Sequence, residues 1–259
     1  GAGGVQNEGA VSLDGTVTSY LAPKAGFLKD GTPAVYVDAY KGNASMITEI
    51  VYYEKQESTE AVKESEETSV QPVSRLVSPF HDNMTRINDI TLRPAAAVAR
   101  DIDGGRDGVL EMPLMIPLPG YETAADAEKL YLTTWRNYDG KRFNNVFSAV
   151  MDYEDEYYFK YPRQWIVDNT TNVTMGVQAD SRQRIFYIWD PVNKIRGDEL
   201  LTLQTVSEKV WDEREEGQWD GYIELGHRAG MYYVGKITAT TGVYALTEET
   251  LRECFASLD

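Results

Sequence analysis

The first half of the chain alternates apolar and polar residues in short runs, which is the pattern of half-buried β-strands. Asp-Gly pairs such as Asp30-Gly31 separate these runs, and glycine accepts the positive φ angle that a tight turn requires. Short antiparallel strands joined by hairpins are therefore predicted. The predicted strands of this half are residues 16–21, 34–40, 46–53, 72–77, 95–102 and 109–118.

The second half mixes strand and helix patterns. Its predicted strands are residues 143–151, 157–161, 173–179, 184–189, 221–225 and 231–238. The predicted helices are residues 121–132, 198–215 and 247–258, the first with Thr123 as its N-cap. Residues 198–215 have the clearest helical pattern, because their apolar side chains recur at steps of three and four.

The apolar stripes of the helices would be buried if the helices packed on one side of an antiparallel sheet. The sequence therefore predicts a mostly β, α+β fold. In the last helix the expected stripe is Leu251, Phe255 and Leu258. The chain has 259 residues, of which 42% are hydrophobic, so it can form one large domain or two modest ones.

The formal net charge of −16 makes some classes of binding partner unfavourable. Such an acidic surface repels phosphate backbones and anionic lipid, so nucleic acid and membrane surfaces are not expected partners. It suits a cation or a cationic partner. The single cysteine, Cys254, excludes an intrachain disulfide and is expected to be a buried thiol. No apolar run approaches the ~20 residues that span a bilayer.

The segment with the most distinctive chemistry is residues 99–113. It carries four acidic residues on a glycine-rich loop and then turns apolar: Asp101, Asp103, Asp107 and Glu111. Alternate carboxylates on such a loop collect oxygen ligands around a hard cation such as calcium. The same residues can also form a loop whose carboxylates accept hydrogen bonds from backbone N–H groups. Both interpretations remain open at this point.

This loop resembles the calcium-type loops of FG-GAP and VCBS repeats, which build blades of surface β-propellers. The residues that fall on the pattern are Asp103, Gly105, Asp107, Gly108, the Val109 carbonyl and Glu111. Gly105, at the middle ligand position, has no side chain, and Asp101 just upstream is the candidate substitute. The resemblance implies a partial propeller-like module over residues 16–120. It also implies a calcium site made by Asp101, Asp103, Asp107, Val109 and Glu111.

Residues 157–165 resemble the start of PsbP-like domains, in which an aromatic strand ends in an aromatic-Pro-x-x-Trp motif. Strands, a long helix, a hairpin and a terminal helix follow in that family. The resemblance implies a PsbP-like domain over residues 150–259, with residues 121–149 as a connector and residues 1–15 as a flexible tether. Together the two halves resemble exported lipoproteins of gut Firmicutes whose function is uncharacterised.

Other candidate sites are weaker. Trp211 and Trp219 flank an acidic turn and are candidate ligand contacts at the surface. Tyr157, Phe159 and Tyr161 share one face of a strand and are expected to be core. The turn at residues 154–156 is expected to be solvated.

No catalytic residues are predicted, because the chain has two histidines and no nucleophile elbow, phosphate-binding loop or zinc motif. We therefore expect a non-catalytic, calcium-stabilised binding or scaffolding module of a bacterial surface lipoprotein. It would be held outside the membrane by a lipid or tether rather than spanning it, and its partner would be a surface protein or glycan. The alternative is a glycan-acting hydrolase that uses a pair of carboxylates.

Overall fold

The computed structural model describes residues 17–41, 45–53, 72–77, 98–124, 130–152, 154–167, 170–178 and 182–258. The predicted tether at residues 1–15 lies outside these ranges. So do positions 95–97 of one predicted strand and residues 125–129 of the first predicted helix.

The chain divides into two compact units, each built from separate segments of the sequence. Unit 1 comprises Gly1–Met115 and Thr134–Val146, and unit 2 comprises Ile116–Thr133 and Phe147–Asp259. The chain therefore passes from one unit to the other three times. The passages lie within strands β6 (Met112–Pro117), β7 (Tyr131–Tyr138) and β8 (Phe143–Asp152).

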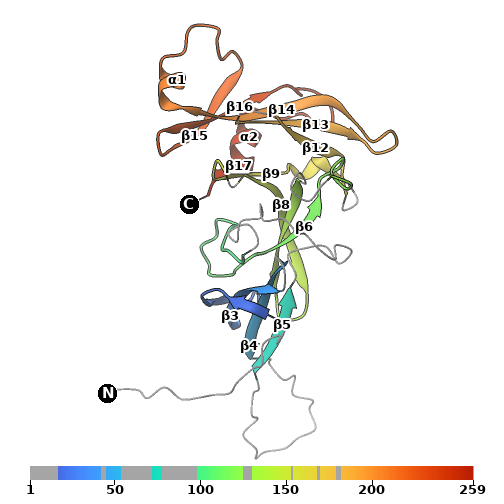
Figure 1. The fold of residues 1–259 in the computed structure, drawn as a ribbon, viewed down its shortest axis with the longest axis vertical. Coiled ribbons are helices and arrows are strands. Elements are labelled where there is room, and N and C mark those ends of the chain that lie inside the picture. Colours follow the sequence, from blue (N-terminus) through green and yellow to red (C-terminus); the bar gives the residue numbers. More distant parts are fainter. Residues whose placement is uncertain are drawn as a thin grey trace, which may run out of the picture. The chain divides into compact units, whose positions relative to one another are not determined.

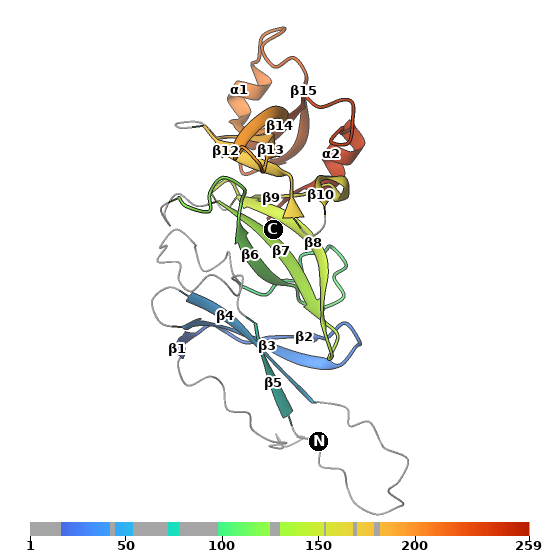
Figure 2. The same ribbon diagram turned by 90° about the vertical axis from the view of Figure 1, so that its right-hand side faces the viewer.

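Unit 1 contains an antiparallel sheet near the blue end of the colour scale in Figure 2. Its strands are β1 (Val17–Tyr20), β2 (Lys24–Phe27), β3 (Pro33–Lys41), β4 (Ser45–Tyr53) and β5 (Pro72–Val77). The order is β1-β3-β4-β5, with β2 also paired to β3. Four of these strands confirm the alternation pattern. Strand β2 was not predicted, because its four residues, Lys-Ala-Gly-Phe, are too short a run to show alternation.

The core of unit 1 lies on one face of this sheet. Its buried members are Leu28, Ala34, Tyr36, Ile50, Tyr52, Ala99, Leu110, Met112 and Tyr138. Asp38 is also fully buried, and its charge is compensated from three directions. Lys24 Nζ lies 2.9 Å from Oδ2, while the Thr48 hydroxyl and the Ala99 N–H donate to Oδ1. This compensation ties residue 99, just before the acidic loop, to the sheet.

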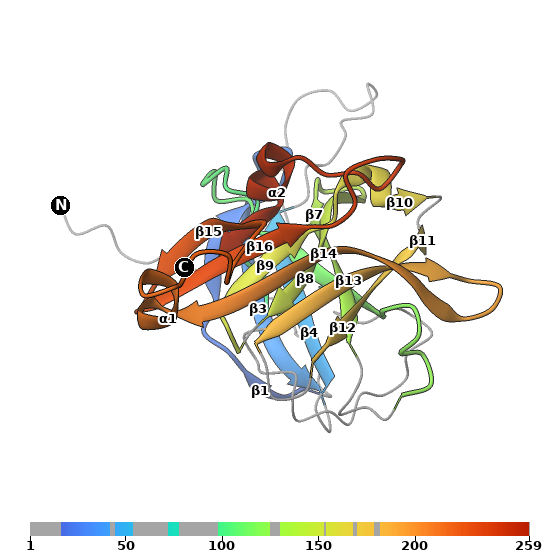
Figure 3. The same cartoon turned by 90° about the horizontal axis from the view of Figure 1, so that it is seen from above.

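Two further antiparallel sheets complete the fold (Figures 1 and 3). One has the order β17-β9-β8-β7-β6, with β9 (Tyr157–Lys160) and β17 (Phe255–Ser257). The other has the order β12-β13-β14-β16-β15. Its strands are β12 (Val173–Val177), β13 (Gln183–Asp190), β14 (Ile195–Ser207), β15 (Tyr222–Arg228) and β16 (Met231–Ile237).

Short elements make up the rest. They are a 3-10 turn (Arg163–Trp165), the pair β10 (Ile166–Val167) and β11 (Thr170–Thr171), and the helices α1 (Glu208–Asp212) and α2 (Glu248–Cys254). The described residues thus form a mostly β fold with three main antiparallel sheets and two short helices. They form no closed propeller.

The predicted helix at residues 198–215 is wrong. Strand β14 occupies this region up to Ser207, and only the five residues of α1 are helical. β14 is the central strand of its sheet and is covered on both faces: Leu201 and Leu203 belong to one buried cluster and Val206 to another. Apolar and polar residues do not alternate along a strand that is buried on both faces. The apolar residues of β14 therefore fell at steps of three and four, which is the spacing expected of a helix. The long helix implied by the PsbP-like resemblance is therefore absent from this position.

The other two helix predictions were partly wrong. The last helix begins as predicted, with the Thr247 hydroxyl accepting from Thr250 N–H, but it ends at Cys254. Phe255 then enters β17 and pairs with Phe159 of β9. Pairing with an open strand edge satisfies backbone groups that a further helical turn would also have satisfied. In the first helix prediction, no described residue is helical: residues 121–124, including the expected N-cap Thr123, form a turn. Residues 131–132 belong to β7, which continues as a strand to Tyr138.

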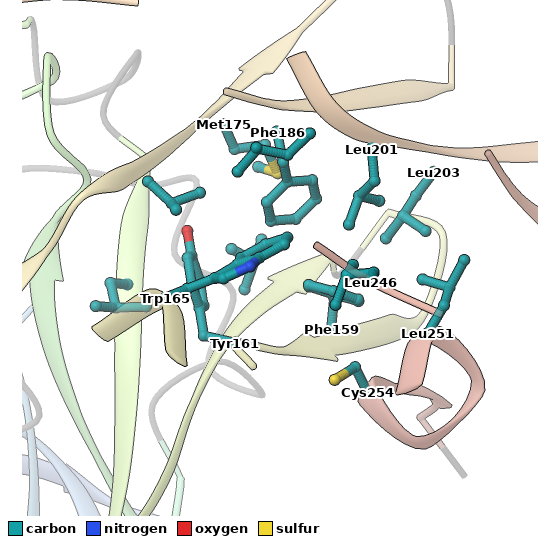
Figure 4. Packing of buried hydrophobic residues seen from close by; sticks show 14 of the residues in the cluster. Phe159, Tyr161, Trp165, Met175, Phe186, Leu201, Leu203, Leu246, Leu251 and Cys254 are labelled. Atoms are coloured by element: carbon teal, nitrogen blue, oxygen red, sulfur yellow. The ribbon is translucent and has the colours of Figure 1, made fainter. Parts of the chain in front are cut away.

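The core of unit 2 is an aromatic cluster, shown in Figure 4. Phe186 is fully buried, with its ring centroid 4.9 Å from that of Phe159 and about 6 Å from those of Tyr161 and Trp165. The aromatic residues of the 157–165 segment are therefore core, as expected. Cys254 is buried beside them, and burial raises the pKa of its thiol to about 11, as expected for an unreactive cysteine.

We expect Phe186→Ala to lower the free energy of unfolding by roughly 3–5 kcal/mol, because it removes a fully buried ring and leaves a cavity among three other rings. Guanidinium unfolding followed by tryptophan fluorescence reports on this unit, since four of the five tryptophans lie in it. The control is Val192→Ala, at a side chain that is 86% exposed. Equal effects of the two substitutions would contradict this description of the core.

Candidate metal centre

The acidic loop is closed by a short antiparallel bridge. Arg100 and Glu111 exchange backbone hydrogen bonds of 2.9 and 2.7 Å, so residues 101–110 form a loop between them. Strand β2 holds the far side of the loop, because the Phe27 N–H donates to the Gly108 carbonyl at 2.8 Å. A Cβ atom at Gly26 would lie 2.5 Å from the same carbonyl oxygen. Only glycine therefore allows β2 to approach this closely.

Three aspartates organise the interior of the loop through backbone hydrogen bonds. Asp101 Oδ2 accepts from Gly108 N–H (3.0 Å), Asp103 Oδ1 from Gly105 N–H (2.8 Å) and Asp107 Oδ1 from Val109 N–H (2.9 Å). The bonds of Asp103 and Asp107 are the two-residue turns that the structural interpretation of the sequence predicted, and the bond of Asp101 spans the loop. They use one oxygen of each carboxylate, so cation binding through the second oxygen remains compatible with them.

Gly105, in the middle of the acidic loop, lies against the Asp103 carboxylate. A Cβ atom there would lie 2.9 Å from Asp103 Oδ1, which is closer than normal carbon–oxygen contact. In this loop, a ligand for that position must therefore come from another residue.

The structure brings three of the five predicted metal ligands together. Asp101, Asp103 and Glu111 each place a carboxylate oxygen within 4.8 Å of the other two. Asp107 is not a member of this group, and its Oδ2 lies 3.9 Å from Lys29 Nζ. Val109 is held by its hydrogen bond to Asp107, and its side chain is buried. Hereafter the acidic triad means Asp101, Asp103 and Glu111.

Glu111 is the unusual member of the triad, because its side chain is fully buried. Oε2 accepts a hydrogen bond from the Ile102 N–H at 3.1 Å, whereas Oε1 has no hydrogen-bond partner within the described part of the chain. Burial, together with the nearby charges of Asp103 and Asp101, raises the pKa of Glu111 to about 7. The hydrogen bond from Ile102 and the Asn137 side chain oppose the rise.

Asn137, on β7, is a neighbour of the triad that the sequence analysis missed. It is 4% exposed, and its Oδ1 has no hydrogen-bond partner among the described residues. It follows Glu111 by 26 positions in the chain and belongs to no acidic motif. Its proximity to Glu111 arises from the tertiary fold and has no local signal in the sequence.

The donor set suits a hard cation. All three triad groups are carboxylates, which calcium and magnesium prefer, and the set contains no histidine or cysteine of the kind that zinc prefers. A divalent cation here would offset the cost of a buried carboxylate that has two acidic neighbours.

The two tryptophans suggested as surface contacts lie in unit 2. Trp211 is only 6% exposed and packs with Val206 and Val234. Trp219 packs edge-on against Trp211, with ring centroids 5.9 Å apart, and lines a shallow acidic hollow on the surface. Of the two, Trp219 is therefore the one that reaches solvent.

The turn at residues 154–156 was expected to be solvated, and for Asp155 this is wrong. Its side chain is 1% exposed and lies 3.3 Å from Arg182, and Asp152 similarly pairs with Arg184 at 3.0 Å. Burial and the charge of Asp152 raise the pKa of Asp155. A buried carboxylate pair thus exists in unit 2, but each member faces an arginine. This arrangement holds the turn after β8 against β13.

No known protein family, curated protein or solved structure matches this chain. Within the described ranges, no helix has the length and apolar character needed to cross a membrane.

With a chelator present, we expect stability to fall as the pH rises from about 4.5 to about 7. Over this interval Glu111 is ionised in the unfolded chain but still protonated in the folded protein. The free energy of unfolding therefore falls by on the order of 2–3 kcal/mol. Glu111→Gln should remove this part of the pH dependence in urea unfolding measured with EDTA. The control is Glu216→Gln, at an exposed position. If the free energy of unfolding depends on pH in the same way in the wild type and in Glu111→Gln, the raised pKa of Glu111 is contradicted.

Gly26→Ala should loosen the acidic loop, because the new methyl group collides with the Gly108 carbonyl. We expect a loss of roughly 1–3 kcal/mol, typical of overpacking, and faster hydrogen–deuterium exchange of residues 98–111. Ala25→Ser, at the preceding exposed position, is the matched control. If the hydrogen–deuterium exchange of residues 98–111 is the same in both variants, the contact with β2 does not stabilise the loop.

Proposed function

We propose that this protein is a non-catalytic, calcium-stabilised binding or scaffolding module that works outside a bacterial cell. The observation that carries the proposal is Glu111, a fully buried carboxylate with one unpaired oxygen, placed beside two further carboxylates. Such a group is costly unless a cation or a proton compensates it. Calcium is the hard cation that extracellular modules commonly bind, with affinities as weak as about 10⁻⁴–10⁻³ M.

Other features support the extracellular setting. The net charge of −16 suits a medium rich in divalent cations and disfavours anionic partners such as nucleic acid. The resemblance of the loop to FG-GAP and VCBS repeats, which occur in exported proteins, points the same way. The partner that we propose is a surface protein or a glycan.

The non-catalytic part of the proposal is supported by the state of the buried carboxylates in unit 2. A glycosidase needs one carboxylate free to act as a nucleophile or base and another that delivers a proton. Asp152 and Asp155 instead pair with Arg184 and Arg182. We therefore favour a structural role for this pair over the hydrolase alternative.

Calcium should raise the melting temperature of the wild-type protein relative to EDTA. At a concentration ten times the Kd, binding adds about 1.4 kcal/mol to the free energy of unfolding. Asp103→Asn should abolish this gain with little change in EDTA, because asparagine keeps the oxygen that accepts from Gly105 N–H but loses the charge. Calorimetric melting and titration with calcium would measure both effects.

The matched control is Asp107→Asn, in the same loop but outside the acidic triad. It should keep most of the calcium response. A wild-type protein that neither binds calcium in the titration nor melts later in its presence would overturn the proposal. An equal loss in both variants would mean that Asp107 joins the ligand set.

A further inference from the structure

The Asn137 side chain lies close to the Glu111 carboxylate. β6 and β7 are adjacent in an antiparallel sheet, and the Leu118 N–H donates to the Leu130 carbonyl at the other end of the pair. Glu111 directly precedes β6, and the Asn137 side chain on β7 lies within hydrogen-bond reach of its carboxylate.

Both side chains are buried, and each has an oxygen that no described group satisfies. Glu111 is fully buried and Asn137 is 4% exposed, and the unpaired atoms are Glu111 Oε1 and Asn137 Oδ1. While Glu111 is ionised, both atoms are hydrogen-bond acceptors and cannot satisfy each other. Buried acceptors of this kind normally have a partner, and a cation held by the acidic triad would provide one.

We infer that Asn137 is a fourth protein ligand of the cation, supplied by β7 to the acidic triad through its amide oxygen. This inference rests on the proposed calcium site. An amide oxygen is an ordinary calcium ligand, and it adds coordination without adding a fourth negative charge. Asn137 on β7 thus supplies the side-chain ligand that Gly105 in the loop lacks.

The same amide has a second role when no cation is bound. Rotation about its Cβ–Cγ bond exchanges the nitrogen and the oxygen, and this terminal torsion has two broad minima. In one of them the amide nitrogen faces the Glu111 carboxylate as a donor, as in this structure, and in the other the oxygen does. Asn137 therefore orients Glu111 in the cation-free protein and ligates the cation in the loaded protein.

Two substitutions separate a ligand from a donor. Asn137→Leu removes both the oxygen and the N–H group, whereas Asn137→Asp keeps an oxygen and removes the donor. If Asn137 is a ligand, calcium titration should show a loss of affinity of roughly 10–100-fold in Asn137→Leu and little or no loss in Asn137→Asp. The control is Asn145→Leu, at an exposed asparagine of β8.

Terbium bound in place of calcium gives a second readout that a purely structural role would not change. Loss of one protein oxygen ligand should add about one water to the ion, which shortens the luminescence lifetime in H₂O relative to D₂O. We expect this change in Asn137→Leu and not in Asn137→Asp or Asn145→Leu. Melting in EDTA checks that each variant is folded.

The outcomes are distinguishable. If the wild type binds calcium and both Asn137 variants lose affinity equally, Asn137 is only a donor to Glu111 and the inference is wrong. If both variants bind like the wild type, Asn137 has no part in the site and the inference is again wrong. If the wild type itself binds no calcium, the proposed function fails first.

Discussion

The cost of burying the Glu111 carboxylate is the constraint on which the candidate site depends. A charge removed from water needs a proton, a set of hydrogen bonds or a counter-ion. Glu111 is supported by the Ile102 N–H and the Asn137 side chain, both uncharged, and its neighbours Asp101 and Asp103 add negative charge. Without a cation the group is therefore drawn towards its protonated form. A cation would reverse that balance, since it favours three ionised carboxylates at once.

Two other buried acids show how the same problem is handled elsewhere in the molecule. Asp38 forms an ion pair with Lys24 and accepts hydrogen bonds from a hydroxyl and a backbone N–H. Asp152 forms an ion pair with Arg184. In both cases a cationic side chain of the protein itself provides the opposite charge. Within the described part of the chain, no ion pair to Glu111 is formed. This contrast favours an external cation at Glu111 and not at Asp38 or Asp152.

The two interpretations of the acidic loop turned out not to exclude each other. Asp101 and Asp103 each accept a backbone hydrogen bond, as a purely structural loop requires, and they also gather with Glu111. The loop hydrogen bonds reduce the number of carboxylate positions that a cation must organise on binding. A preformed loop of this kind lowers the entropic cost of binding, which would matter for a site with few protein ligands.

The sequence by itself determined the mostly β character, most of the strands and the chemistry of the loop, because alternation and Asp-Gly turns are local signals. It did not predict β14, since burial on both faces of a central strand removes the alternation that marks a strand. It also did not separate Asp107 from the triad or identify Asn137. Those assignments depend on which strands lie side by side, and strand pairing is a property of the whole sheet, decided by burial far from the residues themselves.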